Sequence, residues 1–444
     1  MSPIPSPSPL QSPTQTLLPR HSQKVLAAYS FLFLMGCPVV DNSPSDAGPS
    51  AQVFYQGRHV STLSFGANDN SEVVKLLPTG DRAVLIASKA RKLTLLRVDD
   101  NGLEELQNKI LFPDDNGESE LTHVDFNSTG TFAAITRTLP VRQGDTLVDC
   151  QGSIVFVDLH EDRFGDILLE LPVGPMPDAV DISDDDKWAV TADEVDFNDG
   201  KCDLEEKKAS VTVVEIPDGD PTRAVVRESL VMQSQDGQNK REPEQIIFAA
   251  NNDTVAVTLQ DTHEVLFFSV SDVQNQKLVR MPNRDDGAEP WPDGVARIQD
   301  AAGEPYFVVA GEYNDTFALF DLEGELQKLV EIRASDVPSD LPRNLESWSL
   351  APFRPDSAVG FSFDGHQHVA FSLKHAGAVG VWNVDDIDQI YVESVVKIGN
   401  QDTGTPTTES SMGTEGISAN NAGFIVTANE GESSASLVAP LTDL

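Results

Sequence analysis

Short apolar runs, each bounded by turn-forming residues, recur along most of the chain. The clearest unit lies within residues 171–216 and contains runs at 171–174, 176–184, 187–193 and 210–216. Pro, Gly, Asp or Asn residues bound these runs, a pattern typical of short antiparallel strands joined by turns. The pattern therefore predicts a four-stranded antiparallel unit.

The second run of this unit recurs in six other places. Aligning one apolar position in each copy gives spacings of 50, 56, 66, 49, 64 and 58 residues, and the aligned residues are Val74, Val124, Val180, Ile246, Val295, Val359 and Ile417. Such intervals fit a four-stranded blade of about 45 residues that carries loop insertions. We therefore predict an all-β fold, a β-propeller of seven blades.

Ring closure is also predicted from the strand pattern. The last copy supplies three strands, the third at 436–439, and a fourth is missing. Residues 60–66 match the outer-strand segment 168–174 and would supply it, so that N- and C-terminal strands share one blade and no sheet edge is left open. We expect residues 51–444 to form this single propeller.

The N-terminal segment has the features of an export signal. Arg20, His21 and Lys24 precede an apolar run at 25–36, which is too short to span a bilayer. Residues 34–37 resemble the bacterial lipoprotein box, although Met35 departs from its usual residue, and Cys37 would be lipidated. We expect a signal peptide at 1–37 with a long N-terminal lead, then a flexible tether at 38–50. The alternative is an ordinary cleaved signal.

These features predict an exported lipoprotein, either periplasmic or at the cell surface, that touches the membrane only through its lipid. The charge agrees with a role away from nucleic acid: 31 Lys and Arg residues face 71 Asp and Glu residues, a net charge of -40 that repels phosphate backbones. Cys150 and Cys202 lie in equivalent loops of adjacent predicted blades, so we expect a disulfide between them; two free buried thiols are the alternative.

Several segments resemble known surface propellers. Residues 173–178 and 189–194 resemble YVTN-type bacterial surface propellers. Residues 427–432, 242–246 and 257–260, with the acidic insertion 193–203, resemble the choice-of-anchor I domain family over roughly residues 60–440. This resemblance implies an extracellular or cell-surface β-propeller, and it implies no particular activity.

Acidic residues recur at one position of the repeat. Five copies place an acid in register at the start of the inner strand, and Asp356 lies one position early in a sixth; the five are Glu72, Asp178, Glu244, Asp293 and Glu415. Carboxylates converging on the channel axis would bind Ca²⁺ or Mg²⁺, with Ca²⁺ the cofactor we expect of such a site. The alternative is that each acid accepts hydrogen bonds from backbone N–H groups and joins neighbouring blades.

No nucleophile elbow, phosphate-binding loop or zinc-protease motif is present. The leading hypothesis is therefore a non-enzymatic module that binds a small ligand or an envelope protein. The alternative is a metal-dependent propeller hydrolase, lactonase-like or phytase-like, and a third is a purely structural envelope protein. His366 and His368 are either a transition-metal pair or two solvent-facing residues at a hairpin tip.

Overall fold

The computed structural model describes residues 53–66, 69–115, 118–195, 208–232, 241–339, 341, 352–398 and 413–441. The chain divides into two compact units, Met1–Ala51 and Gln52–Leu444, and all of these residues belong to the second. The predicted signal peptide, Cys37 and the tether lie outside the described residues.

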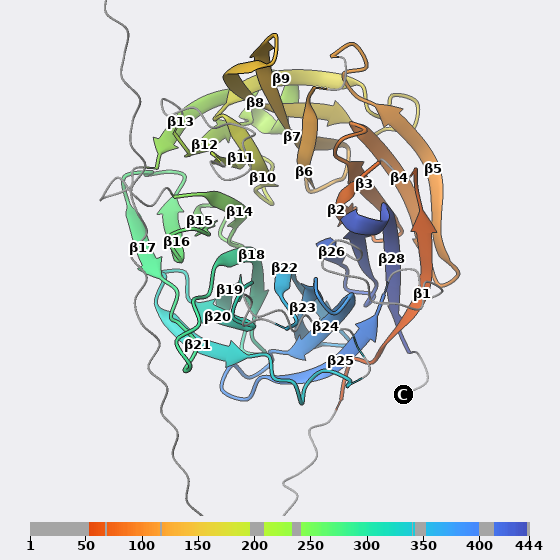
Figure 1. The fold of residues 1–444 in the computed structure, drawn as a ribbon, viewed down its shortest axis with the longest axis vertical. Helices are drawn as coiled ribbons and strands as arrows, with labels where there is room; N and C mark the ends of the chain where they lie inside the picture. Colours follow the sequence, from red (N-terminus) through yellow and green to blue (C-terminus); the bar gives the residue numbers. More distant parts are fainter. Residues whose placement is uncertain are drawn as a thin grey trace, which may run out of the picture. The chain divides into compact units, whose positions relative to one another are not determined.

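Seven four-stranded antiparallel sheets form a ring, which confirms the predicted seven-bladed β-propeller (Figure 1). Blades one and two comprise β2 (Ser71–Leu76), β3 (Arg82–Ala87), β4 (Lys92–Asp99), β5 (Gly102–Ile110), β6 (Glu120–Phe126), β7 (Phe132–Gln143), β8 (Thr146–Asp158) and β9 (Ile167–Val173). Blades three and four comprise β10 (Met176–Ile182), β11 (Trp188–Glu194), β12 (Ser210–Glu215), β13 (Val225–Val231), β14 (Pro243–Phe248), β15 (Thr254–Leu259), β16 (Glu264–Ser269) and β17 (Gln276–Arg280).

Blades five and six comprise β18 (Pro292–Gln299), β19 (Pro305–Gly311), β20 (Thr316–Phe320), β21 (Leu326–Glu331), β22 (Pro355–Phe363), β23 (His366–Leu373), β24 (Ala378–Asn383) and β25 (Tyr391–Lys397). Blade seven comprises β26 (Thr414–Ala419), β27 (Ile425–Asn429), β28 (Ser434–Pro440) and β1 (Gly57–Ser64). The helices in the described residues are the short 3₁₀ turns η1 (Pro217–Gly219), η2 (Pro221–Arg223) and η4 (Glu430–Glu432). None of them is long and apolar enough to cross a membrane.

The hydrophobic core lies between the blades. Each of the seven large apolar clusters takes side chains from two adjacent blades, as where Phe317 of blade five packs against Phe371 and Trp382 of blade six. Both faces of every sheet are therefore buried. This explains why the central strands are nearly continuous apolar runs instead of alternating apolar and polar residues.

The ring closes as predicted. Strand β1 is the outermost strand of blade seven and pairs antiparallel with β28, from Gly57 opposite Pro440 to Ser64 opposite Ser434 (Figure 1). An N-terminal and a C-terminal strand thus share one sheet, and the order β1-β28-β27-β26 completes its four strands.

Two residues ahead of β1, Phe54 and Tyr55, fasten the N-terminal chain to blade six; we call them the N-terminal latch. The Glu393 carboxylate on β25 accepts hydrogen bonds from the backbone N–H groups of Phe54 (3.2 Å) and Tyr55 (2.7 Å). Tyr55 is fully buried, and its hydroxyl donates to the Gly423 carbonyl at 3.0 Å. The latch therefore joins blades six and seven in addition to the β1–β28 pairing.

Candidate functional site

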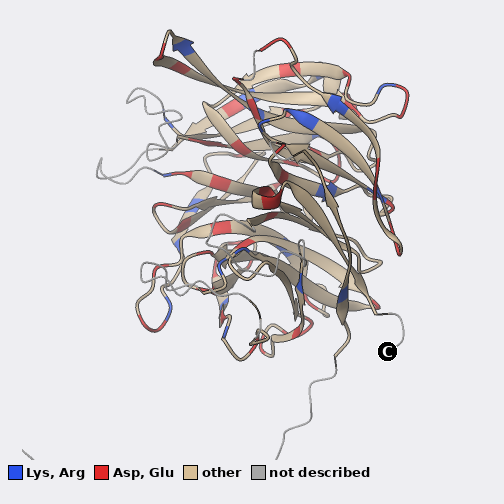
Figure 2. Ribbon diagram, turned by 45° about the vertical axis from the view of Figure 1, so that its right-hand side comes forward, with Lys and Arg blue, Asp and Glu red and all other residues tan. Residues whose placement is uncertain are grey.

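The inner strands of the seven blades line a central channel of about 680 Å³. Its lining includes nine carboxylates against three cationic side chains, Lys75, Arg297 and Lys374. The channel lining is acidic, and so is the whole chain, which contains more Asp and Glu residues than Lys and Arg residues (Figure 2). A site of this kind attracts cations and repels anions.

Every inner strand carries a β-bulge close to its start. In blade three, for example, Pro177 pairs with Asp193 and Ala179 pairs with Ala192, so Asp178 has no direct partner on the second strand. The same irregularity occurs in the inner strand of each other blade. A bulge twists the strand and turns the extra residue away from the ladder. In this fold it turns that residue towards the channel.

The first bulge position is acidic in six of the seven blades, where it is occupied by Glu72, Asp178, Glu244, Asp293, Asp356 and Glu415; Thr122 takes the place in blade two. All five acids predicted from the repeat are among them. The register corrects blade six: Ala358, not Val359, is the equivalent of Val295, so Asp356 is in register and not one position early. The error arose because the equivalent position is occupied by Ala358, and the more apolar Val359 follows directly after it.

A second set of side chains comes from the neighbouring strand of each blade. In blade three the residue after Asp193, the partner of Pro177, is Glu194. The equivalent residues in chain order are Ser88, Thr138, Glu194, Gln260, Glu312, Lys374 and Glu430. We call these residues and the six bulge acids the carboxylate mouth. This second set was not predicted, although its sequence signal, Thr-Ala-Asp/Asn-Glu, occurs at both 191–194 and 427–430.

Two groups of three carboxylates arise where blades meet. Oxygens of Asp178, Glu194 and Glu244 lie within 4.8 Å of one another at the junction of blades three and four. Oxygens of Asp293, Glu312 and Asp356 lie within the same distance at the junction of blades five and six. Each group has the same construction: the bulge acid and second-strand acid of one blade, and the bulge acid of the next.

Blades seven and one repeat this construction with Glu415, Glu430 and Glu72. Burial raises the pKa of Glu72 well above its usual value, and the nearby Glu415, Asp178 and Glu430 carboxylates raise it further. The pKa of Glu430 is likewise raised by burial and by Glu415. Three of the seven junctions thus carry three carboxylates from equivalent positions.

At the junction of blades six and seven, a lysine occupies the second-strand position. The Lys374 ammonium lies 3.2 Å from Asp356 Oδ2 and also forms an ion pair with Glu415. It therefore supplies a positive charge between two bulge acids at the position that a glutamate holds in the three carboxylate groups. Arg354 is a second local cation, with its Nε 2.5 Å from Glu312 Oε1.

The crowding of acids alters their protonation. Burial and the neighbouring Glu194 and Asp178 raise the pKa of Glu244 well above its usual value, and burial with Asp356 and Glu312 does the same for Asp293. Burial raises the pKa of Asp356 to about 7 in spite of Lys374. Like charges held close together disfavour ionisation. A bound divalent cation would remove this repulsion and favour the ionised carboxylates.

Hydrogen bonds between blades are accepted at the other end of the inner strands. Asp125 Oδ2 accepts from the Ile182 N–H (2.8 Å), Asp181 Oδ2 from the Phe248 N–H (2.7 Å) and Ser418 Oγ from the Leu76 N–H (3.0 Å). Residues three positions further along, about 10 Å away along a strand, thus also make the inter-blade hydrogen bonds that were considered for the bulge acids.

The other predicted residues have different outcomes. Cys150 is buried and disulfide-bonded, but Cys202 lies outside the described residues, so their pairing stays a prediction. His366 and His368 do not form the expected metal pair or solvent-facing pair: His366 Nδ1 lies 2.6 Å from Asp385, and fully buried His368 lies 3.0 Å from Glu393.

Comparison with known proteins agrees with the predicted family. Residues 72–285 match the model of the choice-of-anchor I domain, which confirms the predicted resemblance to a family that implies exported or cell-surface proteins. No match is found among curated proteins.

Similar solved structures include a streptogramin B lyase, with a TM-score of 0.53 and 12% identity over 86% of this chain and 98% of that chain. A catalytically inactive virginiamycin B lyase from Staphylococcus aureus, solved with quinupristin, has a TM-score of 0.52 and 13% identity over 86% and 99%. Kuenenia stuttgartiensis hydrazine synthase has a TM-score of 0.55 and 11% identity over 85% and 97%. At these identities the likeness shows the fold alone.

Proposed function

Because residues 72–285 match the choice-of-anchor I domain, we propose that this protein is an extracytoplasmic binding module, held at the cell envelope by a lipid on Cys37, whose carboxylate mouth binds divalent cations. Ca²⁺ is the first candidate, since it takes six to eight oxygen ligands and tolerates irregular geometry. A small ligand or an envelope protein would then bind at the carboxylate mouth with its cations in place.

The observation that carries the proposal is the repeated construction of the junctions. Two junctions bring three carboxylates within 4.8 Å of one another, and a third places Glu72 and Glu430 beside Glu415, which raises the pKa of both. At the junction of blades six and seven, the ammonium of Lys374 lies between Asp356 and Glu415 instead. The fold thus already neutralises one pair of bulge acids with a cation of its own. The three-carboxylate groups have the chemistry to bind a cation from solution. In the group at blades five and six, such a cation would compete with Arg354 at Glu312 and with Lys374 at Asp356.

Thermal unfolding of the purified protein in EDTA and then across a Ca²⁺ titration tests the proposal. Binding at a hundredfold excess over Kd stabilises the native state by about 2.7 kcal/mol. We expect a saturating rise in Tm that is reduced in Asp178→Asn and Asp293→Asn and retained in Asp272→Asn, an exposed aspartate outside the channel. An unchanged Tm would assign the carboxylate mouth a purely structural role.

The proposed lipid on Cys37 can be tested separately from cation binding. Cys37→Ser removes the atom that would be acylated, so we expect the variant to leave the membrane fraction and to lose incorporation of a labelled fatty acid. Membrane association that persists in Cys37→Ser would show that another feature attaches the protein.

The same carboxylate groups support a second function, metal-dependent ester hydrolysis. A cation bound by Asp178, Glu194 and Glu244 could polarise an ester and activate water. The Ca²⁺-loaded protein would then hydrolyse lactones or phosphate esters, and Asp178→Asn would abolish turnover while the fold is kept. Binding of Ca²⁺ without turnover would leave the binding module as the function.

A further inference from the structure

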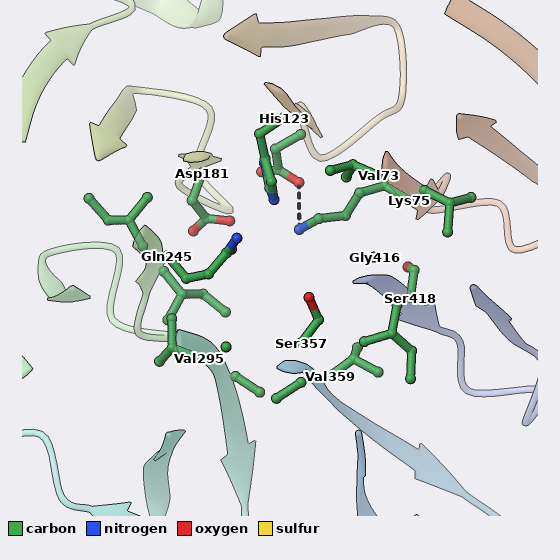
Figure 3. A pocket seen from close by; sticks show the side chains of 18 of the residues that line it. Val73, Lys75, His123, Asp181, Gln245, Val295, Ser357, Val359, Gly416 and Ser418 are labelled. Carbon is green, nitrogen blue, oxygen red and sulfur yellow. Dashed lines mark ion pairs between the residues drawn. The ribbon is translucent and has the colours of Figure 1, made fainter. Parts of the chain in front are cut away.

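A second group of polar side chains faces the channel beyond the carboxylate mouth. Figure 3 shows Lys75, His123, Asp181, Gln245 and Ser357 pointing into the channel from five different blades. We call these five residues the inner polar cluster. His123, Gln245 and Ser357 all occupy the second position of their bulges, next to the first-position residue.

His123 is a neutral hydrogen-bond donor. Its side chain is buried, with the whole residue 7% exposed, and its Nδ1 accepts a hydrogen bond from the Val180 N–H at 3.4 Å. Burial and the nearby Lys75 lower its pKa to about 3. The remaining proton is therefore on Nε2, and this nitrogen has no hydrogen-bond partner among the described residues while its ring points into the channel (Figure 3).

Gln245 and Ser357 lie on bulges whose backbone is fixed by hydrogen bonds. The backbone N–H of Gln245 donates to Thr258 Oγ1, and that of Ser357 donates to Ser372 Oγ, each at 2.9 Å. These bonds fix the two bulges. The amide of Gln245 and the hydroxyl of Ser357 make no hydrogen bond within the described part of the chain, so both can donate to and accept from a molecule in the channel.

The charged groups around the cluster carry no excess positive charge. Lys75 Nζ lies 3.5 Å from Asp125 Oδ1, and Arg297 Nη2 lies 2.7 Å from Asp184 Oδ1. Asp181 faces the channel and uses one oxygen for the Phe248 N–H. No excess positive charge is left to bind an anion, and the carboxylate mouth repels one. A cation at this cluster would face the N–H groups of Lys75 and His123, which are hydrogen-bond donors and do not coordinate it.

We propose that the inner polar cluster binds an uncharged polyhydroxyl compound, a sugar or a sugar alcohol. Each hydroxyl is one donor and two acceptors, so it satisfies a donor such as His123 Nε2, an acceptor such as Asp181, or the mixed groups of Gln245 and Ser357. A neutral ligand also avoids the cost of an unpaired charge in a buried site. This site goes beyond the proposed cation site, since none of its five residues belongs to the carboxylate mouth.

Isothermal titration of the full protein in EDTA with D-glucose, D-mannitol and myo-inositol tests the proposal, with inorganic phosphate and spermidine as charged probes. We expect saturable binding of at least one uncharged probe, weakened tenfold or more in Gln245→Leu and in Ser357→Ala. Gln299→Leu is the matched control, because Gln299 is exposed on β18 outside the channel. Each variant is first shown to unfold cooperatively.

Three results would overturn the proposal: no binding of any uncharged probe, binding of phosphate or spermidine alone, or binding that Gln245→Leu and Ser357→Ala leave unchanged. Asp178→Asn separates the two sites. It should weaken the Ca²⁺ response and leave polyol affinity within twofold, so failure of either proposal is seen independently of the other.

Discussion

The Asp181 carboxylate of blade three accepts a 2.7 Å hydrogen bond from the backbone N–H of Phe248 in blade four. Phe248 is fully buried, so Asp181 is the acceptor that satisfies its N–H in the folded protein. Asp125 and Ser418 make equivalent bonds between other blades. Blades are therefore joined by specific polar contacts near the channel as well as by the apolar clusters between their faces.

Asp181→Ala should destabilise the propeller because it leaves the Phe248 N–H buried without an acceptor. The expected loss is about 1–3 kcal/mol in the free energy of unfolding. Denaturant unfolding at pH 7 measures it. Asp181→Asn keeps an oxygen at this position and is the control, with a smaller expected loss. Equal stability of the alanine variant and the parent protein would contradict this role.

The cation-free protein should become less stable as the pH rises from about 5 to 8. Folding raises the pKa of Glu72, Glu244, Asp293 and Asp356, the last to about 7, so the folded state binds more protons than the unfolded chain in this range. Each extra proton bound changes the unfolding free energy by about 1.4 kcal/mol per pH unit. Carboxylates with lowered pKa, such as Asp286 at about 2, act below this interval. Burial lowers the pKa of His59, His123 and His263 from 6.5, so these three groups oppose the trend below about pH 6.5, and the four acids outnumber them.

Denaturant unfolding in EDTA at pH 5, 6, 7 and 8 measures this dependence. Saturating Ca²⁺ should flatten the curve, because a bound cation keeps the same carboxylates ionised in the folded state. Stability that rises from pH 5 to 8 in EDTA would show that the mouth acids do not govern it.

Lys374→Met should destabilise the cation-free protein, since Asp356 and Glu415 lose the ammonium between them. Breaking such a mostly buried ion pair costs about 3 kcal/mol. Lys374→Glu goes further and gives the junction of blades six and seven the carboxylate set found at three other junctions. Titration calorimetry should then show one more bound Ca²⁺ per chain than in the parent protein; an unchanged stoichiometry would argue against the junctions as the cation sites.

Glu393→Gln should release the N-terminal latch. The carboxylate accepts the N–H groups of Phe54 and Tyr55 and lies 3.0 Å from His368 Nε2, and an amide cannot accept all three. Hydrogen bonds to a charged group contribute about 1.5–3 kcal/mol. Hydrogen exchange of the Phe54 and Tyr55 amides should accelerate in this variant and stay slow in Glu228→Gln, an exposed position on β13.

The number of blades could be predicted from the sequence because every blade is buried in the same way and so carries the same pattern. Both faces of each sheet are buried between blades, so every copy carries apolar runs with turn residues between them. Strand β1 was also predictable, since residues 60–66 repeat the pattern of an outer strand whose partner lies at the opposite end of the chain.

The carboxylate mouth was only half predictable. The bulge acids recur at one repeat position, but in β22 the small Ala358 holds the aligned position and Val359 follows it, so the apolar pattern places Asp356 one residue too early. Glu194 and Glu312 join them through pairing between strands and between blades, which spacing within one strand does not reveal. His368 was misjudged because Tyr55, more than 300 residues away, helps to cover it.

The N-terminal latch also determines how the protein bears force. A pull on the chain ahead of residue 53 reaches Phe54 and Tyr55 first, so the hydrogen bonds to Glu393 and the Tyr55–Gly423 bond carry the load before the β1–β28 ladder does. Once these few contacts break, the tension acts on the β1–β28 pairing at the outer edge of blade seven. The latch thus takes up tension on the N-terminal chain before it reaches the strand pairing that closes the ring.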